Sequence, residues 1–312
     1  MKIARYDTSV RDAWNNFVRD SKNGNFLFNR HYMEYHADRF IDYSLMCYDE
    51  KDHLIAVLPA TVKDSVVISH GGLTYGGVIS RSEMKTVTML HVFAALRDYM
   101  KADGKKRLIY KAIPHIFHAM PADEDLYALF VNKAHLYRRD ASSAIYLPER
   151  MKFAKGKREG IRKALRNNIV VRESCDFRVF FDIGRKVMSE RHSLTPVHTS
   201  DEMELLAGRF PDNIKLYASF AGDEMLAGAI TYDLQHSIHI QYMYNSDRGL
   251  DVGALDIVLD QLINNVYSEY RYLSFGVSTE NDGTYLNEGL IHQKEMFGAR
   301  SVVHDFYELD FY

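Results

Sequence analysis

A repeat within the chain is the feature that most constrains its fold. The segment Met33–Asp42 reappears as Met203–Asp212, with six of ten positions identical and a constant offset of 170 residues. After each copy in the sequence, turn-forming residues (49–53 and 221–224) separate two segments rich in β-forming residues, which is the pattern of a β-hairpin. A helix–hairpin order that recurs at one offset predicts two similar domains in tandem.

The rest of each half follows a parallel order of strands and helices. The first half predicts strands at 43–48, 54–62, 65–69, 107–112 and 141–147, helices at 83–102 and 123–135, and a glycine-rich turn at 70–77. The second half predicts strands at 214–220, 225–233, 237–244, 272–278 and within 301–311, and helices at 254–267 and 285–297. This alternation predicts an α/β fold with a mixed sheet covered by helices. The length of 312 residues suits two domains, at 1–150 and 151–312.

Composition narrows the class of protein. The net charge of −3 and the pI of about 6.5 do not suggest a dedicated nucleic-acid-binding protein, and we expect no binding to DNA. No apolar run approaches the ~20 residues that span a bilayer, and the first residues lack the apolar core of a secretory signal, so we expect a cytoplasmic protein. Cys47 and Cys175 fit no metal-ligand spacing, and the sequence predicts no metal site.

A basic segment joins the two halves. Lys152–Arg172 contains eight basic residues and one acid, Glu159. One interpretation is a solvated linker helix. The other is a face that binds an anionic ligand such as a nucleotide, CoA or RNA, with Arg158 and Arg162 as contacts to substrate.

The loop at 246–253 is the second candidate for phosphate binding. A strand ends before it, Arg248 and Gly249 turn the chain, and Gly253 precedes a helix. Glycines allow close approach of backbone N–H groups, and a helix N-terminus attracts anions. The loop matches neither the dinucleotide nor the P-loop signature. A plain strand–helix turn is the alternative, and Asp247 and Asp251 would repel an anion.

These residues carry a family resemblance. Arg248-Gly249 and Gly253-Ala254 at the start of a helix resemble the acyl-CoA loop of GNAT N-acyltransferases, with a wider glycine spacing. Gly289-Leu290 and Gln293-Lys294-Glu295-Met296-Phe297-Gly298 resemble the end of FemABX-type transferases, with Gln293 in place of the usual Phe. FemABX-type proteins are tandem GNAT-like domains, which agrees with the repeat.

The resemblance implies roles for particular residues. The central strand at 237–244 would present a backbone N–H to the donor carbonyl, and Lys294 would stand where the family has a general acid. A solvent-facing lysine is the alternative for Lys294. Contacts to acyl-CoA are expected from Met243, Tyr244, Arg248, Gly249, Val252, Gly253, Ala254 and Asn287.

Candidates for the base and for acceptor binding come from the second half. His192 and His198 flank Pro196 in a loop, and histidine suits proton transfer near neutral pH. On a regular strand, His239 and Gln241 would share one face, and Tyr242 and Tyr244 the other. The substrate-binding candidates are Arg191, Gln241, Tyr242 and Glu280, and the catalytic candidates are Lys294, His198, His192 and His239.

Three functions remain open from the sequence. The leading hypothesis is an N-acyltransferase that moves an acyl group from acyl-CoA to an amine of a small polar or sugar-nucleotide acceptor by direct attack. The first domain would then be a degenerate copy that shapes the acceptor cleft. The alternatives are an aminoacyl-tRNA-dependent peptidyltransferase of the FemABX type and a non-enzymatic ligand-binding protein of the same fold.

Overall fold

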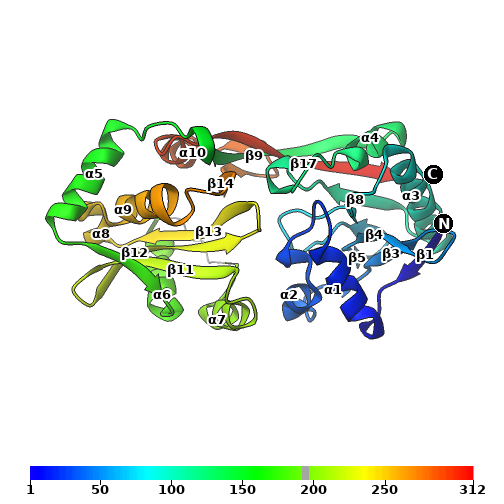
Figure 1. Ribbon diagram of the computed structural model, residues 1–312, viewed down its shortest axis with the longest axis horizontal. Coiled ribbons are helices and arrows are strands. Elements are labelled where there is room, and N and C mark those ends of the chain that lie inside the picture. Colours follow the sequence, from blue (N-terminus) through cyan, green and yellow to red (C-terminus); the bar gives the residue numbers. More distant parts are fainter. Residues whose placement is uncertain (192–196, 312) are drawn as a thin grey trace. The chain divides into compact units, whose positions relative to one another are not determined.

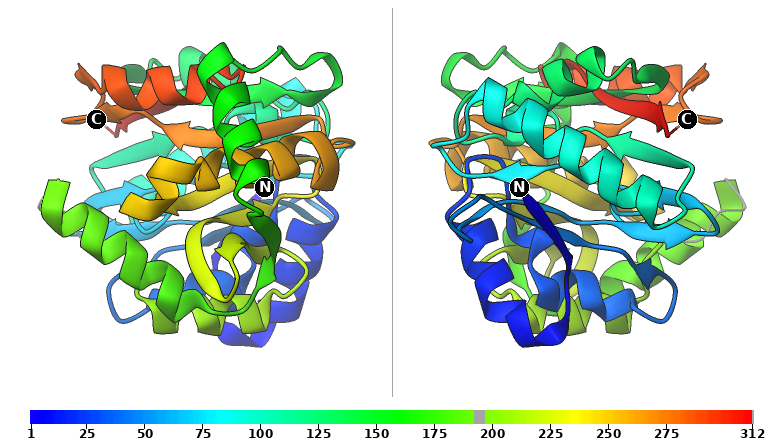
Figure 2. Two further views of the ribbon diagram at one scale, coloured as in Figure 1. Left: turned by 90° about the vertical axis from the view of Figure 1, so that its left-hand side faces the viewer. Right: turned by 90° about the vertical axis from the view of Figure 1, so that its right-hand side faces the viewer.

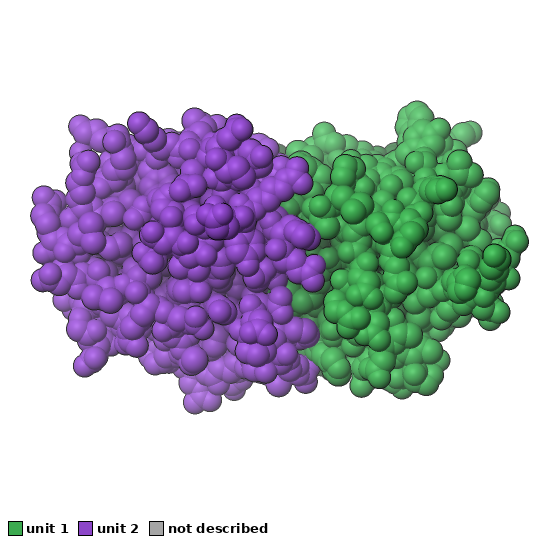
Figure 3. Space-filling view, viewed as in Figure 1, with its two compact units in different colours: residues 1–141, 279–285, 303–312 green, residues 142–278, 286–302 purple. Residues whose placement is uncertain are grey.

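The computed structural model describes residues 1–191 and 197–311, with side chains for 1–188 and 197–311. The chain forms two compact units (Figure 3). Unit 1 comprises Met1–Ala141, Thr279–Tyr285 and Val303–Tyr312, and unit 2 comprises Ser142–Ser278 and Leu286–Val302. Unit 1 is therefore built from segments far apart in the sequence. The assignment of donor binding and acceptor binding to separate domains remains a prediction.

Unit 2 is built on a mixed sheet whose strands follow the order β10-β11-β12-β13-β14-β9 (Figure 1). Neighbouring strands pair antiparallel, whereas β13 and β14 pair in parallel. The strands are β9 (His135–Tyr146), β10 (Val170–Ser174), β11 (Ile214–Ala221), β12 (Glu224–Asp233), β13 (Ser237–Asn245) and β14 (Tyr272–Val277).

Helices cover both faces of this sheet. On one face, Phe180 of α6 packs against Tyr244 and against the backbone at Gly228. On the other face, α9 contributes Leu255, Val258 and Leu259 to a buried core with Ile240. The helices of unit 2 are α5 (Lys155–Arg166), α6 (Phe177–Arg191), α7 (Ser200–Arg209), α8 (Asp247–Val252), α9 (Ala254–Gln261) with a π-helical turn at Leu262–Val266, and α10 (Glu288–Glu295).

Unit 1 contains the parallel pair β6–β8, with β17 antiparallel to β8 on its other side. Its strands are β1 (Lys2–Arg5), β2 (Ile41–Asp42), β3 (Leu45–Tyr48), β4 (Leu54–Leu58), β5 (Thr61–Lys63), β6 (Val66–Ile68), β7 (Ile79–Ser80), β8 (Arg107–Lys111), β15 (Thr279–Glu280), β16 (Tyr285–Leu286) and β17 (Arg300–Asp310). Its helices are α1 (Arg11–Arg19), α2 (Arg30–Met33), α3 (Thr86–Ala102) and α4 (Glu124–Val131), and its short 3-10 turns lie at Thr8–Val10, Phe26–Phe28, Glu34–His36 and His115–Phe117. A further 3-10 turn, Leu147–Glu149, belongs to unit 2.

The predicted α/β fold with a mixed sheet is confirmed, and the differences concern where elements end. The strand expected at 54–62 is divided between β4 and β5. The helix expected at 123–135 stops at Val131, because Lys133 takes a left-handed backbone conformation with φ of 60°. The loop expected at 246–253 is largely helical, since Ser246 caps α8 by accepting the Gly249 N–H.

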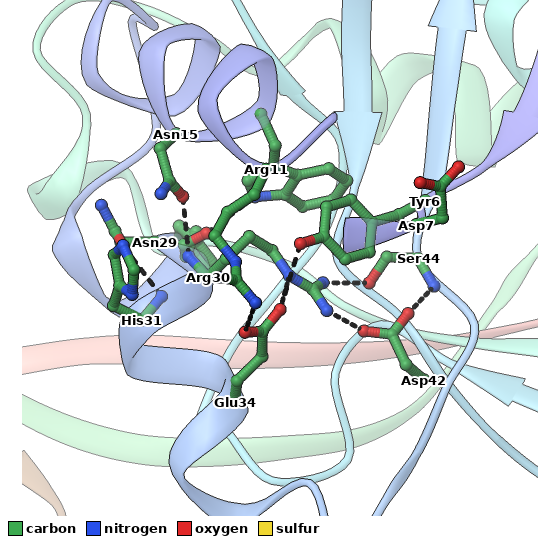
Figure 4. Close-up of polar contacts among 12 residues, drawn as sticks. Tyr6, Asp7, Arg11, Asn15, Asn29, Arg30, His31, Glu34, Asp42 and Ser44 are labelled. Carbon is green, nitrogen blue, oxygen red and sulfur yellow. Dashed lines mark hydrogen bonds and ion pairs between the residues drawn. The ribbon is translucent and has the colours of Figure 1, made fainter. Parts of the chain in front are cut away.

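The repeated segment of unit 1 is held by a buried arginine (Figure 4). The Arg30 side chain is 3% exposed and donates from Nε to Glu34 (3.1 Å) and from Nη1 to Ser44 (3.1 Å). Its Nη2 donates to Asp42, and its guanidinium lies 3.6 Å from the centre of the Tyr6 ring. Buried guanidinium groups need such partners. Glu34 and Asp42 of the repeat therefore have a structural role.

Candidate active site

The two parallel strands of unit 2 separate in the middle of the sheet. β13 and β14 pair from Ser237–Tyr272 to His239–Ser274, and β13 then continues to Asn245. The strand that the resemblance assigns to the donor carbonyl is β13. Its second half therefore lies beside a divergence of the two strands, where an extended ligand can reach the backbone.

A β-bulge at Gln241 changes which side chains share a face. In the pairing with β12, Ile240 faces Thr231 and Tyr242 faces Ile230, so Gln241 has no partner in the register. His239 pairs with Tyr232, two residues from Ile230 on β12. His239 and Tyr242 consequently lie on one face of the sheet. The expected division, with His239 and Gln241 opposite Tyr242 and Tyr244, is wrong because a bulge reverses the alternation.

His198 and Tyr242 are brought together on this face. The His198 Nδ1 lies 2.6 Å from the Tyr242 hydroxyl, and the His198 backbone N–H donates to the same hydroxyl at 3.2 Å. Burial raises the pKa of Tyr242, while hydrogen bonds from the His198 backbone and the Gln241 side chain lower it. The hydroxyl oxygen accepts the His198 N–H through one lone pair, so we assign its own proton to the bond toward Nδ1, and a second lone pair is left for another donor. A neutral His198 then carries its own proton on Nε2.

Lys294 is anchored at the end of β14. Its ammonium donates to Gly276 O (2.9 Å), Val277 O (2.7 Å) and Ser278 Oγ (2.7 Å), and the residue is 2% exposed. Burial lowers the pKa of Lys294 to about 8. Three acceptors match the three donors of an ammonium. This geometry suits a residue that positions the end of β14, and the solvent-facing alternative is wrong.

The predicted CoA loop has few backbone donors to offer. The Gly249 N–H is used by Ser246 (3.0 Å), and Arg248 pairs with Glu224. Gly253 adopts a left-handed conformation with φ of 76° and joins α8 to α9. Asp256 places a carboxylate in the first turn of α9, where a phosphate would otherwise be favoured.

The start of α9 is covered by α5 (Figures 1 and 2). A Cβ at Gly253 would lie 2.3 Å from the Gly160 carbonyl oxygen, so the two backbones touch. Lys157 of α5 completes the contact by pairing with Asp256 at 2.9 Å. The chain's own helix thus occupies the space before the α9 N-terminus.

The remaining predicted residues occupy varied places. Asn287 caps α10 by accepting the Leu290 N–H at 3.0 Å. Met243, Val252 and Ala254 pack in or against the buried core of unit 2. Glu280 is an exposed residue of β15 in unit 1. Arg191 ends α6, and its side chain lies outside the described residues, as does the whole of His192.

A cavity of about 430 Å³ lies in unit 2 between α5 and the turn after α9. Arg158 and Arg162 border it, and both are exposed. The rest of its lining comes from the basic segment and the residues just before it, and from α9 and the turn that follows: Arg150, Met151, Lys152, Phe153, Ile161, Asp260 and Asn264. The sequence did not indicate the part played by Asp260 and Asn264, which are about 100 residues away along the chain. The available signal was the density of basic residues in 150–162.

A second cavity, of about 450 Å³, lies in unit 1 and is bordered by the Arg30 network. The charged groups of that network are satisfied within it, as described above. Among the described residues, no group of three His, Cys, Asp or Glu side chains could hold a metal ion. Nor is any described helix both long and apolar enough to cross a membrane.

Comparison with known proteins finds a GNAT domain in the second half of the chain and a similar fold over nearly all of it. Residues 151–282 match the family model of an acetyltransferase (GNAT) domain, and no curated protein matches the sequence. The structure of FemX is similar with a TM-score of 0.68 at 10% identity, over 99% of this chain and 97% of that one. The structure of L-PGS from Bacillus licheniformis is similar with a TM-score of 0.62 at 14% identity, over 98% of this chain and 93% of that one.

A tandem GNAT protein from the clavulanic acid biosynthesis pathway gives a TM-score of 0.50 at 8% identity, over 100% of this chain and 98% of that one. At such identities the likeness of the solved structures concerns the fold. Residues 151–282 therefore match a GNAT domain. The fold of the chain is similar to those of FemX and of a tandem GNAT protein.

Proposed function

We propose that this protein transfers an aminoacyl group from aminoacyl-tRNA to an amine of a small acceptor molecule. The observation that carries the proposal is the packing of α5 against α9. Gly160 lies against Gly253, and Lys157 neutralises Asp256, so a pyrophosphate at the start of α9 would have to displace a packed helix. This arrangement disfavours CoA at that position and reverses the preference drawn from sequence.

The outer side of α5 supports a polyanionic donor instead. Lys157 is turned inward, whereas the other basic residues of the helix are exposed to solvent. A phosphate backbone gains affinity from such an array by releasing counterions. The exposed basic residues of α5 are Lys155, Arg158, Arg162, Lys163 and Arg166.

The structural neighbours agree with an aminoacyl donor. One is FemX, and another is the C-terminal domain of a putative lysylphosphatidylglycerol synthetase from Agrobacterium fabrum, with a TM-score of 0.60 at 12% identity. The product in the latter name is a lysyl ester. The FemABX-type resemblance of residues 289–298 also implies that a tRNA-borne donor is possible chemistry for this fold.

The site on β13 offers a route for the proton. As the amine nitrogen attacks the donor carbonyl carbon and the N–C bond forms, its proton passes to the Tyr242 hydroxyl oxygen. The hydroxyl proton moves at the same time to His198 Nδ1, 2.6 Å away. When the ester C–O bond breaks, the proton returns to the leaving oxygen of the tRNA. At the bulge, the backbone of Gln241 is not used in the pairing of β12 with β13. It is therefore available to stabilise the oxyanion that forms on the donor carbonyl.

Acyl-CoA remains the second candidate donor. The divergence of β13 and β14 beyond His239–Ser274 favours it, because that geometry admits an extended thioester beside the strand. The matched acetyltransferase (GNAT) domain is consistent with this donor.

The donor can be tested by binding. We expect a tRNA transcript to bind the protein with an affinity that falls steeply between about 50 and 200 mM salt. CoA, acetyl-CoA and longer acyl-CoAs at about 100 times a measurable Kd would each add about 2.7 kcal/mol of stability, and we expect no such shift. A rise in Tm with an acyl-CoA, together with weak tRNA binding, would reject the proposal in favour of the second donor.

A further inference from the structure

The cavity between α5 and the turn after α9 combines positive charge with an apolar floor. Phe153 is 9% exposed and stacks edge-on against Phe297, with ring centres 5.3 Å apart. Ile161 packs against the same core. A volume of about 430 Å³ lies in the range of small-molecule sites.

The charge around this cavity is not balanced within the protein. The side chains of Lys152, Arg158 and Arg162 form no hydrogen bond or ion pair with another described residue. The acid in the lining, Asp260, instead accepts from Asn264 at 2.7 Å. Three cations held around one concave surface of a chain with a net charge of −3 favour a bound anion.

Other groups of the wall are fixed in place. Arg150 donates from Nε to Asn264 (2.8 Å) and from Nη1 to Leu147 O (3.1 Å). Asn264 lies on the π-helical turn Leu262–Val266, a local irregularity that shapes this side of the cavity. A hydrogen-bonded polar wall together with exposed cations suits recognition of a ligand with one charged and one planar part.

We propose that this cavity binds a nucleotide of the tRNA donor, with its phosphate between Arg158 and Arg162 and its base over Phe153 and Ile161. Guanidinium groups pair with phosphate through parallel hydrogen bonds, and an aromatic and aliphatic floor accepts the face of a base. That the nucleotide belongs to a tRNA rests on the proposed function, whereas the recognition of a nucleotide phosphate by this cavity does not.

The location separates this site from the reacting groups. The cavity belongs to the side of the sheet that α9 covers, and Tyr242 and His198 lie on the side of α6. A ligand bound in the cavity therefore does not contact the Tyr242 hydroxyl. A donor that reaches both places must be larger than a single nucleotide.

The experiment compares two double variants of α5 with the same loss of charge. Arg158→Gln with Arg162→Gln removes two cations that line the cavity, and Lys163→Gln with Arg166→Gln removes two exposed cations outside it. The Kd of a tRNA transcript is measured at several salt concentrations, and that of adenosine 3′,5′-bisphosphate at one. Unfolding curves verify that both variants fold.

We expect the cavity variant to bind tRNA about 10-fold or more weakly, with a salt slope reduced by about 2, and to lose affinity for the bisphosphate. The control variant loses two other cations of the same array, so it should lose several-fold less tRNA affinity and should bind the bisphosphate with the Kd of the parent protein. Equal losses in both variants would mean a diffuse charged surface and would overturn the cavity. Loss of the bisphosphate alone, with tRNA binding unchanged, would overturn RNA as the carrier. If the parent protein binds the bisphosphate through Arg158 and Arg162 but binds no tRNA, the proposed donor fails and the nucleotide site stands.

Discussion

At the scale of single residues, the proposed chemistry depends on one tyrosine whose hydroxyl contacts both the backbone and the ring of a histidine. Tyr242 contacts His198 through both the ring nitrogen and the backbone of the histidine. Its ring also packs against Phe181 and stacks with Tyr244. The hydroxyl is thereby directed toward a single proton acceptor, which is the arrangement that a relay requires.

Replacing Tyr242 by Phe should lower kcat by about 100-fold with little change in the KM for the acceptor. The ring packing is kept, and the path from the amine to His198 Nδ1 is interrupted. Steady-state kinetics with a charged donor measures the effect, and Tyr217→Phe on the opposite face of the sheet is the matched control. An unchanged kcat in Tyr242→Phe would exclude the relay.

Buried histidine makes unit 1 sensitive to acid. Burial lowers the pKa of His118 to about 4, against an ordinary value of 6.5. Below pH 6.5 the unfolded chain takes up a proton that the folded chain refuses, so stability falls as the pH falls toward 4. We expect His118→Gln to lose about 2 kcal/mol less free energy of unfolding than the parent protein between pH 7 and pH 5. Denaturant titrations at the two pH values measure this, and equal losses would contradict it.

At the scale of elements, α5 decides which ligand the second unit can hold. The helix crosses the start of α9 with two glycines at the contact, Gly160 and Gly253. One of its basic residues, Lys157, pairs with Asp256, and the others are exposed to solvent. A segment that reads as a linker in the sequence is thus part of the packed unit.

Gly253→Ala should destabilise the protein by about 2 kcal/mol or more. The new Cβ would lie 2.3 Å from the Gly160 oxygen, and the backbone φ of 76° is itself costly for alanine. Gly156→Ala, on the same helix with nothing within 4 Å, is the control and should stabilise by about 0.5 kcal/mol. Equal free energies of unfolding for both variants would show that α5 does not pack against α9 in solution.

At the scale of the whole molecule, unit 1 depends on the far end of the chain. β17 pairs with β8 from Phe306–Lys111 to Asp310–Arg107, and Leu309 and Phe311 belong to the core of unit 1. Arg107 also pairs with Glu308 and Asp310. The first 150 residues therefore lack a strand and two core side chains of their own unit.

The fragment 1–150 alone should show no cooperative unfolding transition, because the edge of β8 and the apolar surface under Leu309 stay uncovered. Circular dichroism during a urea titration, with the full chain as reference, provides the measurement. A sharp transition in the fragment would establish residue 150 as a folding boundary.

The sequence predicts local patterns well and long-range contacts poorly. The helix α3 and the strands β8 and β14 lie within a few residues of their expected positions, because hydrophobic pattern and turn residues act locally. The bulge at Gln241 escaped prediction, since it is a property of pairing between β12 and β13. His198 and Tyr242 were each singled out, but their contact depends on that bulge.

The position of β17 has a consequence for how the protein is made. A ribosome adds about 5–20 residues per second, so about 10–30 s separate the synthesis of Ala141 from that of Val303. During this time one edge of β8 is unpaired, because β17, the last strand of unit 1, has not yet been synthesised. We therefore expect strands β10 to β14 of unit 2 to be synthesised before unit 1 is complete. We also expect the nascent chain to need protection from aggregation until residue 311 has left the ribosome.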